Sequence, residues 1–235
     1  MDNNDTQPQN DGQPSYPTPL HVQYGEYIAA PTSGVYVFPA TFANCKMVFT
    51  GDDTVGKTSM MIKYTGGELS DEWKPVVFDS WADWVMVQQK STCLSLWDTT
   101  GFAYQKVRPL GYPSTDIFML CFSVVDRRTF DHLTSYWLPE MQFHAKNTPT
   151  FLVGTKADLR GTSKESTGCC KDGEHECPYF GAEIHPDEAR DLAKAIGCIQ
   201  YLECSALTDS QATITQNVFH PAMGWWIQQV EAHAS

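Results

Sequence analysis

The stretch GDDTVGKT at residues 51–58 constrains the fold of this chain more than any other feature. It follows the apolar run CKMVFT and precedes SMMIKYT. A glycine, four residues and then Gly-Lys-Thr, placed between a strand and a helix, is typical of a loop whose backbone N–H groups cradle phosphates. A glycine-rich turn that only begins a helix is the alternative, and the strand before and helix after disfavour it. Asp52 and Asp53 raise a question, because they stand beside the place where a polyanion would bind.

The residues of this loop have separate expected roles. The backbone N–H groups of residues 53–58 should point inward at phosphates, and Lys57 should reach the terminal ones. The hydroxyl of Thr58 is an expected ligand of a magnesium ion. The expected phosphate contacts are Asp53, Thr54, Val55, Gly56, Lys57, Thr58 and Ser59.

Short apolar runs alternate with segments of helical length from Asn44 onward. The runs are CKMVFT, WVMVQ, CLSLW, DIFMLCFSV, TFLVGT and YLECSA. This alternation predicts an α/β domain with a mostly parallel sheet. A chain of 235 residues that is 42% hydrophobic can bury one sizeable core but hardly two.

Two segments lie outside that pattern. Residues 1–43 are rich in Asn, Asp, Gln and Pro and carry no Lys or Arg, so we expect a disordered or loosely docked extension before a domain at 44–235. Residues 161–185 are polar and turn-rich, which indicates a surface insertion. The insertion contains possible metal ligands, but their spacing fits no standard zinc site, and incidental thiols in a solvated insert are favoured. These residues are Cys169, Cys170, His175 and Cys177.

The formal net charge of −12 disfavours binding to nucleic acid or to anionic membrane surfaces. No stretch approaches the ~20 apolar residues of a membrane span, and the amino terminus lacks a signal-peptide pattern. Cys45, Cys93, Cys121 and Cys204 lie inside apolar runs, which suits reduced, buried thiols. We therefore expect a soluble, cytoplasmic protein, and recruitment to a membrane or the cytoskeleton by partners stays open.

Two further motifs indicate which base the site would accept. TKAD at 155–158 and CSAL at 204–207 each follow an apolar strand, and ligands bind at the carboxyl ends of such strands. Asp158 can accept hydrogen bonds from the ring N–H and amino group of guanine, Lys156 can pack along the base, and the Ala206 backbone can meet the carbonyl oxygen. The expected base contacts are Thr155, Lys156, Asp158, Leu159, Ser205, Ala206 and Leu207.

Five more motifs follow the phosphate loop: VFD (77–79), LWDT.G (96–101), RPL.YP (108–113), NTP..LVGTK.DLR (147–160) and YLECSALT (201–208). With these motifs the chain resembles the Rho/Rac branch of the small GTPases, closely over residues 44–208. The resemblance implies a P-loop NTPase fold: a six-stranded, mostly parallel sheet flanked by about five helices, with a Rho-type insert at 161–185. It also implies binding of GTP or GDP with Mg²⁺, held by Thr58 and, through water, by Asp98. Gly101 would contact the nucleotide.

The chain departs from the pattern of that branch at four functional positions. Asp53 replaces a glycine of the phosphate loop, and its side chain is expected to project toward the γ-phosphate and the attacking water. Val76 replaces the threonine of switch I that closes over Mg²⁺. Phe102 replaces the glutamine that orients water, and Gln105 is too far along a shortened loop to take its place. Leu69 replaces an aromatic residue that packs against guanine.

These features predict an atypical GTP-binding signalling protein that hydrolyses GTP slowly or not at all and is GTP-loaded or exchanges nucleotide rapidly. It would engage effectors, and exchange factors, through switch II and through Val77, Phe78 and Asp79 of switch I. The alternative is a pseudo-GTPase scaffold without nucleotide regulation. An ATP-using enzyme is disfavoured by TKAD and CSAL. The tail WWIQQVEAHAS carries no Cys-a-a-X box, so we expect no direct membrane anchor.

Overall fold

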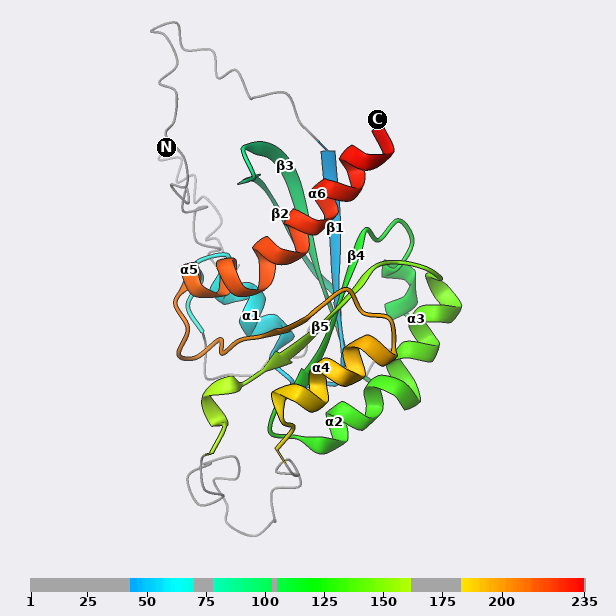
Figure 1. The fold of residues 1–235 in the computed structure, drawn as a ribbon, viewed down its shortest axis with the longest axis vertical. Coiled ribbons are helices and arrows are strands. Elements are labelled where there is room, and N and C mark those ends of the chain that lie inside the picture. The colour runs from blue at the N-terminus through cyan, green and yellow to red at the C-terminus, as the bar shows by residue number, and fades with distance from the viewer. Residues whose placement is uncertain (1–42, 70–77, 103–104, 162–182, 235) are drawn as a thin grey trace, which may run out of the picture.

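The computed structural model describes residues 43–69, 78–102, 105–161 and 183–234. Six strands form one sheet in the order β2-β3-β1-β4-β5-β6, and every pair is parallel except β2 with β3 (Figure 1). The predicted six-stranded, mostly parallel sheet is confirmed. The strands are β1 Ala43–Thr50, β2 Phe78–Val87, β3 Lys90–Thr99, β4 Ile117–Ser123, β5 Thr150–Thr155 and β6 Tyr201–Glu203.

The helical segments of the described residues join into four longer helices, where the sequence predicted about five. A π-helical turn, η2 (Leu133–Trp137), joins α2 to α3, and a second, η5 (Thr215–Phe219), joins α5 to α6. Two short 3₁₀ turns, η1 (Arg108–Gly111) and η3 (Ala157–Leu159), lie in the connections. The α-helices are α1 Lys57–Tyr64, α2 Arg127–His132, α3 Leu138–His144, α4 Pro186–Ala195, α5 Gln211–Ile214 and α6 His220–Ala234.

Each π turn directly precedes a helix whose second residue is proline, Pro139 in α3 and Pro221 in α6. Proline has no N–H to donate and its ring crowds the carbonyl one turn earlier, so the regular ladder of hydrogen bonds cannot pass through it. A π turn widens the helix locally and lets it continue. In η2 this irregular turn carries Tyr136 and Trp137, which both contact the site described below.

Two hydrophobic cores lie on opposite faces of the sheet. One face packs against α1 and the α5–α6 helix, through residues such as Tyr64 and Phe219. The other packs against the α2–α3 helix and α4, through residues such as Phe122 and Trp137. Figure 1 shows these helices on either side of the strands. Strand β4, central in the sheet, is buried at every position, which explains why it reads as a continuous apolar run.

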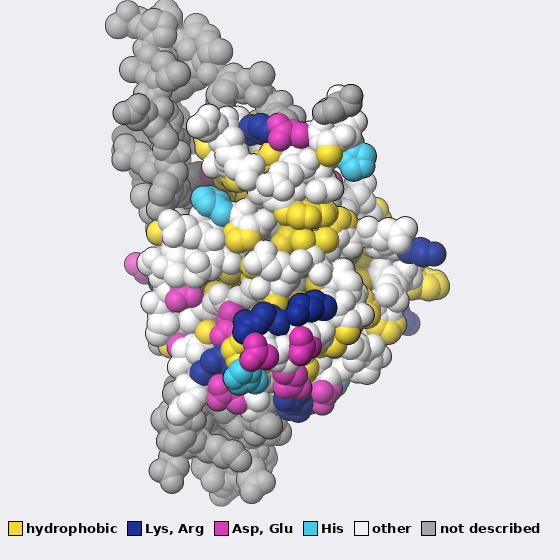
Figure 2. All heavy atoms as spheres, viewed as in Figure 1, with side chains coloured by type: hydrophobic (Ala, Val, Ile, Leu, Met, Phe, Trp, Pro, Cys, Tyr) yellow, Lys and Arg dark blue, Asp and Glu magenta, His cyan; other side chains and the backbone are white. Residues whose placement is uncertain are grey.

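The outer surface of α4 is charged. Its inner side buries Ala189 and Ala193, while Arg190 pairs with Asp187 and Glu188 pairs with Arg127 of α2. Figure 2 shows acidic and basic side chains gathered over this part of the molecule. Such exposed pairs contribute little to stability and mainly keep the surface solvated.

The buried-thiol prediction is confirmed for Cys45, Cys121 and Cys204, whereas Cys93 is only partly buried. No helix in the described part of the chain is both long and apolar enough to span a bilayer. Several predictions fall outside the described residues: the extension before residue 43, the switch I positions Val76 and Val77, and the four Cys and His residues of the insert.

Phe219 joins the carboxyl-terminal helix to the sheet. Its buried ring stacks on Tyr64 at 3.7 Å between centroids and lies 5.8 Å from Phe49. We expect Phe219→Ala to lower the free energy of unfolding by about 3–5 kcal/mol, because it removes a large buried side chain and leaves a cavity. Urea unfolding would measure the change. Phe143→Ala is the control, since that ring is 83% exposed; its effect should stay within about 0.5 kcal/mol. Similar losses from the two variants would contradict the packing described.

Candidate functional site

The phosphate loop connects β1 to α1, and two glycines fix its course. Gly51 has φ +141°, and a Cβ there would lie 2.1 Å from the carbonyl oxygen of Cys121. Gly56 caps α1 with φ 107° and offers no side chain to its first N–H groups. The N–H groups of the first turn of α1 are therefore not capped by a side chain from this position. Such a helix start is suited to an anion.

Lys57 closes the loop from within. Its side chain is buried, and Nζ donates to the carbonyl oxygens of Gly51 at 2.9 Å and Asp52 at 2.7 Å. Burial lowers the pKa of Lys57, and the nearby charges of Asp98 and Asp53 act in the opposite direction. The amine is therefore fixed beside the backbone of the loop that the sequence predicts to bind phosphates.

Thr58 and Asp98 form the second element of the site. The hydroxyl of Thr58, in the first turn of α1, donates to Oδ2 of Asp98 near the end of β3. Hydroxyl and carboxylate oxygens are the ligand types that Mg²⁺ prefers. The pair therefore fits the magnesium site expected from the sequence.

The two motifs predicted to bind the base meet at the carboxyl ends of β5 and β6, which are neighbouring parallel strands. Ser205 Oγ donates to Asp158 Oδ1 at 2.5 Å. The hydroxyl oxygen of Ser205 also accepts from the N–H groups of Leu207 and Thr208. Lys156 adopts a left-handed backbone with φ 60°. These contacts fix the position of Asp158.

Thr155 connects the base edge to the phosphate loop. Its hydroxyl lies 2.5 Å from the carbonyl oxygen of Val55 and 2.9 Å from that of Phe122. The Ala157 N–H donates to the carbonyl of Cys204, which joins the two base motifs. The residues predicted to bind the phosphates and the base therefore lie in contacting segments along this edge of the sheet.

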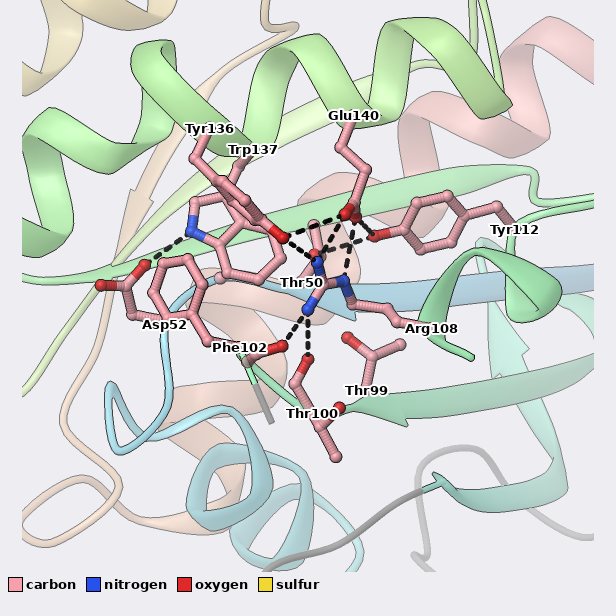
Figure 3. Close-up of polar contacts among 12 residues, drawn as sticks. Thr50, Asp52, Thr99, Thr100, Phe102, Arg108, Tyr112, Tyr136, Trp137 and Glu140 are labelled. Atoms are coloured by element: carbon pink, nitrogen blue, oxygen red, sulfur yellow. Dashed lines mark hydrogen bonds and ion pairs between the residues drawn. The ribbon is translucent and has the colours of Figure 1, made fainter. Parts of the chain in front are cut away.

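Asp52 is not directed at a phosphate but at the α2–η2 helix. Its Oδ1 accepts from Nε1 of Trp137 at 2.6 Å, and its Oδ2 lies 2.7 Å from Nδ1 of His132. Figure 3 shows the contact between Asp52 and Trp137. The first of the two aspartates is thus a structural link between the phosphate loop and the helix beside it.

Asp53 is tied to the turn that follows β3. Its two carboxylate oxygens accept from the N–H groups of Gly101 at 2.7 Å and Phe102 at 2.9 Å. The sequence led us to expect this side chain to extend toward the γ-phosphate, and these two backbone contacts were not anticipated. A Cβ on Gly101 would lie 2.3 Å from the Asp53 nitrogen, so only glycine allows this close approach.

Arg108 holds the same turn from its carbonyl side (Figure 3). Its fully buried guanidinium donates to the carbonyl oxygens of Thr100 and Gly101. It also makes two bonds to Glu140 of α3, at 2.9 and 2.5 Å, and Glu140 accepts from Tyr112 as well. Burial on its own raises the pKa of Glu140, but the bonds from Arg108 and Tyr112 outweigh it and lower that pKa.

The ring of Phe102 packs among aromatic side chains of the α2–η2 helix. Its centroid lies 4.8 Å from Tyr136, 5.5 Å from Trp137 and 5.4 Å from His132. A cavity of about 200 Å³ opens beside these rings. It is lined by Asp52, Asp53, Thr54, Phe102, Arg128 and His132.

Sequence reasoning missed the residues that support the turn after β3. RPL.YP appeared only as part of the resemblance, and nothing in the spacing pointed to a partner for its arginine. The supporting residues are Arg108, Tyr112, His132, Tyr136, Trp137 and Glu140.

Only the backbone of Phe78 and Asp79 is described, at the start of β2, so their expected contacts with partners stay predictions. Leu69 is 36% exposed at the end of the described segment before switch I.

The family model of the Ras family matches residues 46–223, which is most of the chain. The match includes the phosphate loop, the Thr58–Asp98 pair, the turn after β3 and both base motifs. The chain therefore belongs to the Ras family, and its domain is a GTP-binding small GTPase domain.

Glu140→Gln should lower the free energy of unfolding by about 3 kcal/mol at neutral pH, because the buried charge of Arg108 loses its counter-ion. The native pKa of Glu140 is depressed, so its stabilisation is present above its unfolded pKa of about 4.3 and is lost as pH falls through the native value. Urea unfolding at several pH values should therefore show the difference between wild type and variant shrinking below about pH 4.

The matched control is Glu188→Gln, which breaks a two-bond pair with Arg127 whose side chains are 44% and 31% exposed. Its cost should be below about 1 kcal/mol. Equal costs for the two variants, or a Glu140→Gln cost that does not change with pH, would contradict the role given to Glu140.

Proposed function

We propose that this member of the Ras family is an atypical, Rho-like GTP-binding signalling protein that binds guanine nucleotide with Mg²⁺ and turns GTP over very slowly or not at all. One observation carries the proposal. The Lys57 loop, the Thr58–Asp98 pair and the Asp158–Ser205 pair converge along one edge of the sheet. This is the set of groups that a guanine nucleotide and its metal ion need.

Each part of the nucleotide has residues suited to it. Lys57 and the N–H groups at the start of α1 would hold the phosphates, and Thr58 with Asp98 would hold Mg²⁺. When bound, the metal ion neutralises phosphate charge. Asp158 would select guanine, because its carboxylate can accept from the two donors on the edge of that base.

Slow hydrolysis is proposed from the residues near the turn after β3. Catalysis in this fold depends on positioning a water molecule and stabilising charge. The phenyl ring of Phe102 cannot donate or accept conventional hydrogen bonds, and it packs against Tyr136 and Trp137. Asp53 binds the N–H groups of Gly101 and Phe102, which adds a negative charge beside the loop. Phe102 therefore has no group to orient an attacking water, and both carboxylate oxygens of Asp53 are already bound to the turn.

The assignment to the Rho branch is supported by RPL.YP, by Trp97 before Asp98 and by the insertion after residue 160. Leu69 and Val76 replace residues that would close over base and metal, so we propose rapid exchange of nucleotide and occupancy set by mass action. Signalling would pass to effectors through switch II and the VFD segment of switch I.

GTP with Mg²⁺ should raise the unfolding temperature, because a ligand specific for the native state stabilises it by about 2.7 kcal/mol at one hundred times its dissociation constant. ATP should cause no shift. Thermal unfolding with each nucleotide would test this, with Asp158→Ala expected to abolish the GTP shift and Asp131→Ala, an exposed residue of α2, expected to keep it. Equal shifts with GTP and ATP would contradict the guanine assignment. No shift with either would favour the pseudo-GTPase scaffold.

Single-turnover hydrolysis by the wild type should be slower than the intrinsic rate of Ras, which is on the order of 10⁻⁴ s⁻¹. Phosphate release from bound GTP would measure it. The double variant Asp53→Gly with Phe102→Gln should recover measurable hydrolysis, and each single change should recover little, because both act on one step. Phe143→Gln, at an exposed ring of α3, is the control and should leave the rate unchanged. Hydrolysis by the wild type at an ordinary rate for this class of protein would show that Asp53 and Phe102 are harmless.

A further inference from the structure

We propose that Asp53 serves as a built-in anionic ligand for the turn after β3, so that this turn keeps one arrangement whether the bound nucleotide ends in a second or a third phosphate. The turn comprises residues 100–102. The inference rests on the proposed function and concerns how the same site is regulated. It predicts that the site hardly discriminates between GTP and GDP.

The N–H groups of the turn are directed at an anion. Two successive backbone N–H groups, of Gly101 and Phe102, point at one carboxylate and bond to separate oxygens of it at 2.7 and 2.9 Å. Successive N–H groups arranged in this way form an anion-binding concavity. Hydrogen bonds to an ionised acceptor are among the stronger ones in proteins. The turn therefore has an anion site, and a residue of this chain occupies it.

That anion site adjoins the phosphate loop. Asp53 belongs to the phosphate loop, only four residues before Lys57. The N–H groups that it binds therefore face the place where a terminal phosphate would sit. In GTPases the terminal phosphate orders the switch segments, which are released on hydrolysis. In this chain the carboxylate of Asp53 already binds those N–H groups. A terminal phosphate, which is also negatively charged, would have to compete with it.

Other groups of the chain hold the opposite side of the turn. Arg108 donates to the carbonyl oxygens of Thr100 and Gly101, and the ring of Phe102 packs on Tyr136 and Trp137. Arg108 is itself fixed by two bonds to Glu140. The turn is therefore held on its N–H side, on its carbonyl side and through the ring of Phe102 by groups of the chain itself.

The fixed turn limits how far the affinities for GTP and GDP can differ. A ligand shifts a conformational equilibrium only by the difference in its affinity for the two states. Because the carboxylate of Asp53 supplies the contact that a third phosphate would otherwise make, that phosphate gains little from the turn. GTP and GDP should bind with affinities within about threefold of each other, whereas one hydrogen bond from the turn to a charged third phosphate would favour GTP by about tenfold or more.

The affinity test uses displacement of a fluorescent guanine nucleotide by GDP and by a non-hydrolysable GTP analogue. Wild type should bind the two within about threefold, and Asp53→Ala should shift the ratio toward the GTP analogue by about tenfold or more. Asp53→Asn, which keeps the size but not the charge, should shift it in the same direction. Asp131→Asn removes a negative charge from the exposed surface of α2 and should leave the ratio unchanged. A wild-type preference of more than tenfold for the GTP analogue would overturn the inference.

Amide hydrogen exchange followed by NMR reads the turn without depending on a nucleotide. The N–H groups of Gly101 and Phe102 should be protected in wild type alone, with GDP and with the GTP analogue, and Asp53→Ala should lose this protection in the nucleotide-free protein. Leu152 of β5 and Phe118 of β4, whose N–H groups donate to the carbonyl oxygens of Gln200 and Pro149, should keep their protection and so report that the variant is folded. Protection that appears only with the GTP analogue would overturn the inference.

The two arms separate the two proposals. Failure of wild type and every variant to bind guanine nucleotide would overturn the proposed function and the affinity claim together. Binding with a strong wild-type preference for GTP would leave the proposed function in place and overturn only the role given to Asp53.

Discussion

The buried charge of Arg108 is the constraint on which the site depends. A guanidinium that is 0% exposed has no water to solvate it, so the surrounding chain must provide acceptors for its N–H groups. Glu140 of α3 supplies two, Tyr136 of η2 supplies one, and the backbone after β3 supplies the carbonyls of Thr100 and Gly101. Satisfying one charge thus positions the turn after β3 against the α2–α3 helix. Loss of any single acceptor would leave part of that charge unpaired.

The two aspartates of the phosphate loop now have different explanations. Asp52 accepts from Trp137 and lies against His132, so it connects the loop to the same helix that Arg108 contacts. Asp53 accepts from the N–H groups of residues 101 and 102. Both carboxylates are therefore satisfied by the protein. They connect the phosphate loop to the α2–α3 helix and to the turn after β3. Lys57 is bound to the backbone of the loop itself.

The sequence predicted the sheet well because buried parallel strands read as short apolar runs. It assigned Asp158 and Ser205 to the ligand-binding edge because each follows an apolar run, and the structure adds that β5 and β6 are neighbours. The partners of Arg108 and Asp53 could not be predicted. Glu140 lies 32 residues from Arg108, and no periodicity links a turn to one face of a distant helix. The π turn that presents Trp137 follows from Pro139, a signal that shows where a helix is irregular but not what its side chains contact.

A nucleotide switch needs an element with two arrangements that its ligand distinguishes. In this chain the turn after β3 is bound by Asp53 on its N–H side and by Arg108 on its carbonyl side. The ring of Phe102 adds a third attachment, on the helix that Asp52 also contacts. Asp53 and Phe102 therefore act together, because each makes a contact that holds the same turn. On the function proposed here, the nucleotide supplies stability to the domain while the state of this turn is set by the chain, and control of signalling must then act on other segments or on the availability of partners.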